Sequence, residues 1–220
     1  MLKKILIIIF YLISLLFLTI YIINELLPNS FPSELGRIVL LSLTSFFTFL
    51  GSFFLSIQLN NSKPMRITLW FFFILYISLL LTLTLFDPSW GRYGIDLYNI
   101  STKNYNIIPF KTIIDYINLV HNSYLNSNAI VNLFGNIIAF MPMAFFLPIL
   151  FRKERKFKNF LITMILVILC IELTQLITST GRCDIDDFIL NLLGSVLMYL
   201  FIRIEAIEKL IDCIFLQTSK

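Results

Sequence analysis

Residues 171–194, IELTQLITSTGRCDIDDFILNLLG, place ionisable and amide side chains directly beside apolar runs of membrane-spanning length. A charged side chain at the centre of a bilayer costs about 2.5 to 3.5 kcal/mol on insertion scales, so such residues need partners or a function. The polar residues in question are Glu172, Gln175, Arg182, Asp184, Asp187 and Asn191. We therefore take this stretch as the candidate functional site.

The spacing of these residues predicts two adjacent helices that each carry a polar stripe. Glu172 and Gln175 stand at i and i+3, which places both on one face of a helix. Asp184, Asp187 and Asn191 repeat at i, i+3 and i+7 on the next helix. The connection between them is short and contains a glycine, so we expect an antiparallel pair whose stripes face each other.

Composition around this stretch excludes an ordinary soluble domain. Hydrophobic residues make up 58% of the 220-residue chain, charged residues make up 14%, and the mean hydropathy is +0.88. The runs that approach or exceed bilayer length are 5–23, 38–57, 67–86, 129–151, 160–178 and 188–204. The expected fold is an all-α integral membrane bundle of unbroken helices, because barrel strands would not give continuous runs of this length.

Other classes of protein receive no support from the sequence. The net charge of +4 comes from basic residues in short loops, which the positive-inside rule explains, so no nucleic-acid partner is implied. The three cysteines have no paired spacing, so neither a disulfide framework nor a metal cluster is predicted. The first run is longer than the apolar core of a signal peptide and is expected to remain as a helix.

The distribution of charge predicts the topology. Basic residues gather at the N-terminus and in the loops after the second and fourth runs, so these segments are expected in the cytoplasm, together with both termini. They are Lys3, Lys4, Lys63, Arg66, Arg152, Lys153, Arg155, Lys156 and Lys158. The long outer segment 87–128 is expected to hold an amphipathic helix, starting at a capping-box-like pair of Thr112 and Asp115. The tail 205–220 is expected to be a second amphipathic helix, on the inner membrane surface.

With this topology, polar side chains from three helices reach one depth in the outer leaflet. Asn132 and Asn136 would lie about 3 to 10 Å below the outer surface, Glu172 about 9 Å and Asn191 about 5 Å, at about 1.5 Å per residue. Gln175 lies at a similar depth. The loops above this layer carry Arg182, Asp184, Asp187, Arg92 and Lys111. Because these side chains lie at similar depths, we predict that they line a polar pocket in the outer leaflet.

The chemistry of this pocket is suited to an anionic amphiphile, such as a lipid-linked wall precursor or an amphiphilic antibiotic. Arg182, Arg92 and Lys111 could pair with phosphate, while the amides of Asn132, Asn136, Gln175 and Asn191 could bond sugar or peptide groups. The candidate catalytic residues are Glu172, as general acid or base, and Asp187. Asp184 and Asp187 could alternatively hold a divalent cation that bridges to phosphate.

Two alternatives to a binding function remain open, namely catalysis and a purely structural role. No cofactor is predicted and no established catalytic, zinc or phosphate-loop motif is present, so the sequence favours binding over catalysis. The polar layer could instead serve only helix packing, since each interhelical hydrogen bond contributes about 0.6 kcal/mol in membranes. The inner halves of the helices show no polar path, which argues against a solute transporter.

Four motifs in order resemble the VanZ-like family of bacterial membrane proteins. They are NIIPFKTI (106–113), NLFGNIIAFMP (132–142), IELTQ (171–175) and GRCDIDDFILNLLG (181–194). The resemblance implies a multi-pass protein of the bacterial plasma membrane, in a family whose name-giving member is linked to reduced teicoplanin susceptibility. It implies a VanZ-like domain at 67–204. The two helices at 1–66 lie outside the resemblance and are expected to be accessory, and the cytoplasmic tail at 205–220 is expected from its amphipathic pattern. The resemblance also marks Asn106 as one of the polar positions that recur in the family.

Overall fold

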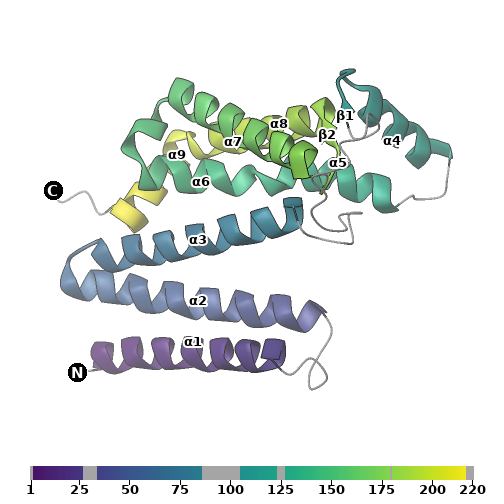
Figure 1. Cartoon of the computed structure of the whole chain (residues 1–220). Helices are drawn as coiled ribbons and strands as arrows, with labels where there is room; N and C mark the ends of the chain where they lie inside the picture. The colour runs from purple at the N-terminus through teal and green to yellow at the C-terminus, as the bar shows by residue number, and fades with distance from the viewer. Residues whose placement is uncertain (1, 27–33, 86–104, 123–126, 179, 217–220) are drawn as a thin grey trace. The chain divides into compact units, whose positions relative to one another are not determined.

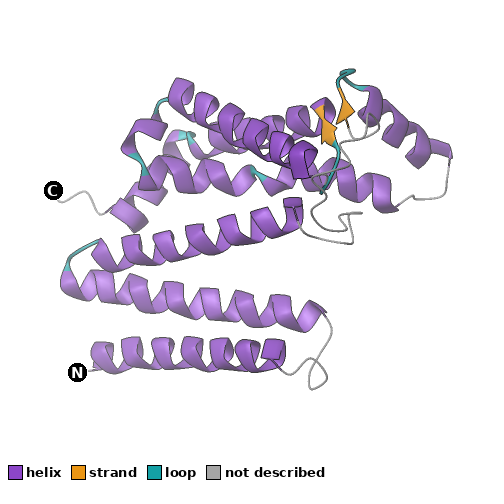
Figure 2. Cartoon of the chain, viewed as in Figure 1, coloured by secondary structure: helices purple, strands orange, loops and turns teal. Residues whose placement is uncertain are grey.

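The computed structural model describes residues 2–26, 34–85, 105–122, 127–178 and 180–216. Nearly all of these residues are helical, and the extended elements among them are two short strands (Figure 2). Within the described residues, six helical spans are long and apolar enough to cross a membrane. The expected all-α multi-pass membrane fold is therefore confirmed.

The order of the elements can be followed in Figure 1. Their bounds are α1 Leu2–Leu26, α2 Glu34–Leu59, α3 Lys63–Leu85, β1 Tyr105–Asn106, α4 Lys111–Asn122, α5 Ser127–Ala139, α6 Met141–Leu150, the 3₁₀ turn η2 Arg152–Arg155, α7 Phe157–Thr178, β2 Cys183–Asp184, α8 Ile185–Ile202, α9 Glu205–Ile211 and the π-helical turn η3 Asp212–Leu216. The predicted outer helix corresponds to α4, and the predicted tail helix corresponds to α9 and η3.

The chain divides into two compact units, each with its own packing. The first unit is Met1–Phe72 with Lys209–Lys220, and the second unit is Phe73–Glu208. Helix α3 begins in the first unit and ends in the second. All the motifs of the candidate site belong to the second unit.

Hydroxyl groups link the helices of the first unit. The Tyr11 hydroxyl lies 2.9 Å from Ser52 Oγ, which lies 2.6 Å from Thr68 Oγ1 on α3. Ser14 Oγ lies 2.6 Å from Thr48 Oγ1. Small hydroxyl residues allow helices to approach closely in lipid, where the hydrophobic effect gives no drive for association. These hydroxyl contacts are therefore typical of helix packing in a membrane.

The core of the second unit lies along one face of α7. Phe160, Met164 and Ile168 recur every four residues and are fully buried, as helical periodicity requires for a face turned inward. The Phe160 ring stacks on Tyr199 of α8 with centroids 4.4 Å apart. Helices α7 and α8 are thus packed neighbours, as the short connection between them predicts.

The fourth predicted span is present as the candidate span Ala129–Leu150, but it is not the unbroken helix that was expected. It is interrupted at Phe140, between α5 and α6, because Pro142 has no N–H and cannot continue the hydrogen-bond ladder. The Met143 N–H turns to the Phe140 carbonyl at 3.1 Å. The Tyr76 hydroxyl of α3 donates to the Ala139 carbonyl at 2.6 Å, which satisfies a backbone acceptor beside the break.

Helices α5 and α8 approach each other at a glycine. A Cβ added to Gly194 would lie 1.8 Å from the carbonyl oxygen of Ile137, which is far inside van der Waals contact. The absence of a side chain at Gly194 therefore permits this approach, as small residues do at helix contacts in membranes. It fixes the distance between the two helices that carry Asn136 and Asp187.

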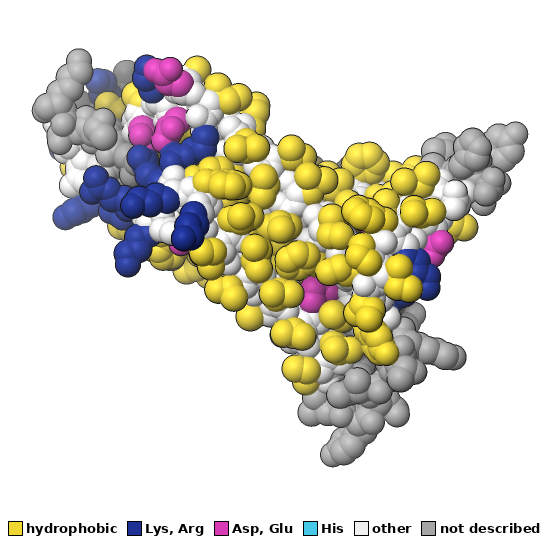
Figure 3. Space-filling view, turned by 90° about the horizontal axis from the view of Figure 1, so that it is seen from above, with side chains coloured by type: hydrophobic (Ala, Val, Ile, Leu, Met, Phe, Trp, Pro, Cys, Tyr) yellow, Lys and Arg dark blue, Asp and Glu magenta, His cyan; other side chains and the backbone are white. Residues whose placement is uncertain are grey.

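Charge and hydrophobic surface are separated on the face shown in Figure 3. Hydrophobic side chains cover its middle, and Lys and Arg side chains gather at one end. The turn η2 supplies Arg152, Lys153 and Arg155, and the exposed Lys156 and Lys158 follow it. Because α7 starts at this basic end, its last turn, which leads to the candidate site, lies at the other end.

Candidate functional site

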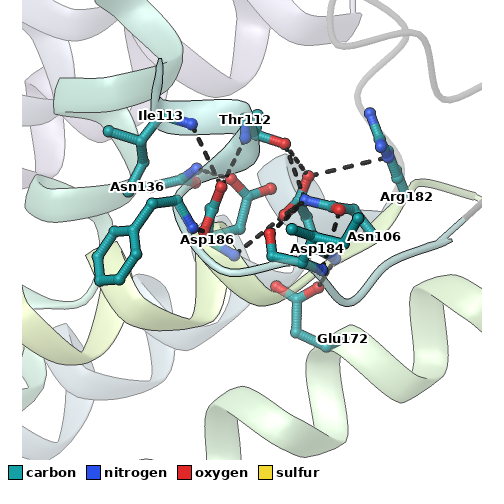
Figure 4. A network of polar contacts seen from close by, with 11 residues as sticks. Asn106, Thr112, Ile113, Asn136, Glu172, Arg182, Asp184 and Asp186 are labelled. Atoms are coloured by element: carbon teal, nitrogen blue, oxygen red, sulfur yellow. Dashed lines mark hydrogen bonds and ion pairs between the residues drawn. The ribbon is translucent and has the colours of Figure 1, made fainter. Parts of the chain in front are cut away.

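Two segments far apart in the sequence pair where α8 begins. Strands β1 and β2 are parallel, with Tyr105 opposite Cys183 and Asn106 opposite Asp184. The pairing brings the segment before α4 against the N-terminus of α8, and side chains from both segments converge there (Figure 4). The motifs NIIPFKTI and GRCDIDD therefore form a single site.

Asp184 is the centre of the polar network. Its Oδ1 atom accepts hydrogen bonds from the Asn106 amide at 2.8 Å and from the Asp186 N–H at 3.0 Å, which caps α8. Its Oδ2 atom accepts from the Thr112 hydroxyl at 2.6 Å and lies 3.8 Å from Arg182 Nε. The side chain is only 3% exposed. A buried carboxylate is thus matched by several donors, as its desolvation requires.

Asp186 caps α4 from a distant part of the chain. Its oxygens accept from the backbone N–H groups of Phe110 at 2.5 Å, Thr112 at 2.7 Å and Ile113 at 3.2 Å. These groups belong to the first turn of a helix and its approach, where N–H groups have no partner within the helix. Phe110 has a positive φ of 66°, a backbone conformation that this network holds in place.

The local capping box predicted for α4 is therefore not how the helix begins, and that detail was wrong. The Thr112 hydroxyl donates to Asp184, while the orphan N–H groups of the helix bind Asp186. A charged acceptor near a helix N-terminus also gains from the helix dipole. The helix itself is present where the sequence predicts it.

Glu172 supports the site from α7. Its Oε2 atom accepts the backbone N–H of Asp184 at 3.1 Å, and the side chain is 5% exposed (Figure 4). The contact fixes β2 against the end of α7. The sequence predicted that the polar residues of these two helices face each other. In the structure, the contact of Glu172 with the start of α8 includes the backbone N–H of Asp184.

Asn136 connects the polar network to an apolar groove. Its amide donates to Asp187 Oδ1 at 2.6 Å, joining α5 to α8. Asn136 also lines a groove of about 390 Å³ between the second half of α3 and the α5–α6 break. The other lining residues are mainly aliphatic, and the polar ones among them include Thr84 and Tyr76. A polar contact therefore stands at the wall of a hydrophobic groove.

Two buried amides at the site have an acceptor without a partner. Gln175 donates from Nε2 to the Thr84 carbonyl at 2.7 Å, but its Oε1 has no hydrogen-bond partner among the described residues. The same holds for Asn191 Oδ1 in this part of the chain. Both side chains are at most 5% exposed. Unsatisfied buried acceptors are uncommon and call for a donor.

The remaining predicted site residues take varied positions. Arg182 is 49% exposed, so its guanidinium can reach an external anion. Lys111 is exposed at the first residue of α4, and Asn132 lies half-buried on α5 one turn before Asn136. Arg92 lies outside the described residues.

Asp186 and Thr112 belong to the network although the sequence did not nominate them as site residues. Asp186 lies off the i, i+3, i+7 stripe that defined the candidates, and Thr112 was assigned to a local cap. Asn106 was included only through the resemblance. An Asp pair in the first turn of a helix is a signal that could have found Asp186, because one carboxylate can cap its own helix and the other a neighbour.

The carboxylates of the site affect two groups outside the membrane spans. Burial raises the pKa of the Cys183 thiol, and the charges of Glu172, Asp184 and Asp187 add to the effect. Burial also raises the pKa of Tyr116 on α4, with further contributions from Asp187 and Asp184 and an opposing one from Arg182. Negative charge therefore dominates the local field.

The donor set does not form a recognisable metal centre in the described part of the chain. No group of three or more His, Cys, Asp or Glu side chains is placed to hold a metal ion there. The oxygens of Asp184 and Asp186 already accept N–H and O–H groups. The network is thus a hydrogen-bonded junction between α4, α7 and α8, which the Asn136–Asp187 contact extends to α5.

These features define a class of protein: a multi-pass helical membrane protein with a buried polar junction at one end of its second unit. The sequence model of the VanZ/LLP1 family matches residues 73–206, which is more than half of the chain and includes every described site residue. The protein therefore belongs to the VanZ/LLP1 family. No curated protein and no solved structure matches the chain.

Proposed function

We propose that the protein binds an amphiphilic ligand in the outer leaflet of the bacterial plasma membrane, and so contributes to teicoplanin-type resistance or to envelope homeostasis. The ligand class is an anionic, lipid-linked envelope precursor or an amphiphilic antibiotic. Its headgroup would meet the polar junction, and its apolar chain would occupy the groove beside Asn136. The observation that carries this proposal is that Asn136 takes part in both.

The charge distribution along the chain supports an external site. Lys and Arg residues gather at η2 and the start of α7, and such clusters stay in the cytoplasm by the positive-inside rule. The polar junction lies beyond the other end of α7. Helix α4 is amphipathic and exposes Ile114 and Ile117, which suits a helix lying at the outer membrane surface.

The groove supports an amphiphile rather than a soluble ligand. Its aliphatic lining favours a hydrocarbon chain, and Thr84 and Asn136 give it a polar region. Arg182 supplies an exposed cation for phosphate or carboxylate. The partnerless oxygens of Gln175 and Asn191 are acceptors for sugar or amide donors.

Binding is favoured over catalysis, although Glu172 and Asp187 remain the candidates if turnover occurs. Both already hold structural contacts, Glu172 to the Asp184 N–H and Asp187 to Asn136. Because both carboxylates already have hydrogen-bond partners, they also support a second candidate function, that of a structural or regulatory protein whose polar junction only sets helix packing. A divalent cation at Asp184 and Asp187 remains a proposal that a titration with Mg²⁺ or Ca²⁺ would test.

A groove-filling substitution separates binding from packing. Leu79 lines the groove and is 56% exposed, so Leu79→Trp fills the groove with little disturbance of the core. Leu75 lies one turn earlier on α3, is 44% exposed and does not line the groove, which makes Leu75→Trp a matched control. Both variants would be compared at equal membrane levels in a Gram-positive host, by teicoplanin susceptibility and by binding of a purified lipid-linked wall precursor.

If the groove binds the hydrocarbon chain of the ligand, Leu79→Trp should weaken the affinity for the precursor about tenfold and raise susceptibility to teicoplanin. Leu75→Trp should behave as wild type. Asp187→Asn should act in the same direction as Leu79→Trp. If both tryptophan variants keep full affinity and full phenotype, the groove does not bind the ligand. If phenotype falls only in proportion to folded protein, the packing function stands instead.

A further inference from the structure

A larger cavity, of about 670 Å³, lies in the second unit between α3, α6 and α7. It extends along α7 from Thr163 to Ile171, and its wall is mostly apolar. The only side-chain oxygens among its lining residues belong to Glu154 and Thr163. Both residues lie near the basic end of the unit, away from the polar junction. The cavity is therefore an open, mostly apolar groove with a carboxylate at one end.

The Glu154 carboxylate is incompletely satisfied. Its Oε1 atom accepts the Thr163 hydroxyl at 3.2 Å. Its Oε2 atom is buried and has no hydrogen-bond partner among the described residues. A buried carboxylate oxygen without a donor is costly, so the position calls for a proton donor or a cation.

The backbone on both sides of Glu154 is held in place. The Lys153 carbonyl accepts from the Asn159 amide at 2.9 Å. The Arg155 carbonyl accepts from the Tyr199 hydroxyl at 2.7 Å, and from Arg203 as well. The 3₁₀ turn that carries Glu154 is thus tied to α7 and α8. Its carboxylate is a fixed part of the cavity wall, which favours a preorganised contact.

The charge outside the cavity has the opposite sign. Arg152, Lys153, Lys156 and Lys158 are exposed in or directly after the same turn. An anionic group is attracted there, and a cationic group is attracted to Glu154 inside. The arrangement matches a zwitterion whose positive end points inward.

We infer that this cavity binds a phospholipid whose headgroup carries a primary ammonium, at the end of the second unit opposite the polar junction. The ammonium donates to Glu154 Oε2, the phosphate lies against the exposed Lys and Arg side chains, and an acyl chain follows α7 toward Ile171. Three N–H donors and a positive charge satisfy the unpartnered oxygen. This site is separate from the proposed outer-leaflet site and does not depend on it.

The test uses the full-length protein in detergent, mixed with equal amounts of phosphatidylethanolamine and phosphatidylglycerol of the same acyl chains. Native mass spectrometry reports the lipid retained, and the unfolding temperature is measured in parallel. Glu154→Gln removes the charge with little change of shape, and Glu205→Gln makes the same change at an exposed carboxylate near the same end. Leu166→Trp fills the cavity, and Leu169→Trp is its control, because Leu169 lies on the same helix outside the lining.

Wild type and Glu205→Gln should retain phosphatidylethanolamine over phosphatidylglycerol about tenfold, and Glu154→Gln should lose that preference. Leu166→Trp should reduce retention of both lipids, while Leu169→Trp should not. The inference is overturned if wild type shows no preference, or if Glu154→Gln keeps it. It is also overturned if soluble phosphoethanolamine competes as well as the lipid, because the apolar cavity would then contribute nothing.

Discussion

Cys183 lies in β2 among the carboxylates of the polar junction, and its thiol reports their charge. Burial is the main cause of its raised pKa, and Glu172 is the first of the charged contributors. The thiolate is the nucleophile in maleimide labelling, so a raised pKa slows labelling near neutral pH. The reactivity of Cys183 therefore depends on its burial and, to a lesser extent, on the charges of the site.

We expect the labelling rate of Cys183 to be low at pH 7 and to rise up to and beyond the ordinary thiol pKa of about 8.5. Glu172→Gln removes a negative neighbour, which favours the thiolate, so its rate profile should move to lower pH. The measurement is a pH series with the purified Cys170→Ser/Cys213→Ser protein. Glu205→Gln, whose carboxylate does not contribute to this shift, should leave the profile unchanged, and an unmoved profile in Glu172→Gln would refute the assignment.

At the scale of elements, the position of α4 depends on a carboxylate from another helix. Asp186 lies in the first turn of α8 and accepts three N–H groups at the start of α4. Helix α4 has 12 residues, which is marginal for an isolated helix, so its order depends on such contacts.

Asp186→Asn should destabilise this junction by about 1 to 3 kcal/mol, because an amide offers a single neutral acceptor where a carboxylate offers two charged ones. Hydrogen exchange of segment 110–114 should become faster, while exchange in the core of α7 should change little. Asp115→Asn, on the same helix and exposed, is the matched control. Equal protection in both variants would show that α4 is held by other contacts.

The contact of α5 with α8 gives a second prediction at this scale. Gly194→Ala places a methyl group against the Ile137 backbone, which cannot move without shifting the helix, so a loss of about 1 to 3 kcal/mol or more is expected. Gly181→Ala meets only the flexible Gln175 side chain, at 3.3 Å, and should cost less. Thermal unfolding in detergent compares the two. Similar unfolding temperatures for both variants would contradict the close approach.

At the scale of the whole molecule, the number of spans and the charge distribution determine the expected orientation. If all six candidate spans of the described residues cross the membrane, the chain returns to the side on which it began. The N-terminal helix α1 begins with Lys3 and Lys4, and the turn η2 is basic. The positive-inside rule therefore predicts that both termini lie in the cytoplasm and that the polar junction lies outside.

Fusions to the full-length C-terminus test this orientation. A green fluorescent protein fusion should be fluorescent, and an alkaline phosphatase fusion should be inactive, because the phosphatase matures only outside the cytoplasm. Insertion of one additional transmembrane helix before each reporter is the control and should reverse both results. An active phosphatase on the unmodified chain would turn the polar junction toward the cytoplasm and contradict the outer-leaflet proposal.

The sequence by itself determined the class of protein and indicated the six candidate spans, and it nominated most of the polar residues of the site. A bilayer demands about 20 apolar residues per span and penalises polar ones, so both signals are local and readable from the order of residues. It also located α4, and the motifs indicated the family that the match over residues 73–206 confirms.

Only the tertiary structure decided how these parts connect. The cap of α4 by Asp186, the pairing of Asn106 with Asp184 and the approach of Gly194 to Ile137 join residues more than fifty positions apart. Local patterns predict which groups need a partner, but not which distant group supplies it. Thr112 shows the difference: its local spacing indicated a capping box, while a buried carboxylate from α8 was the stronger acceptor.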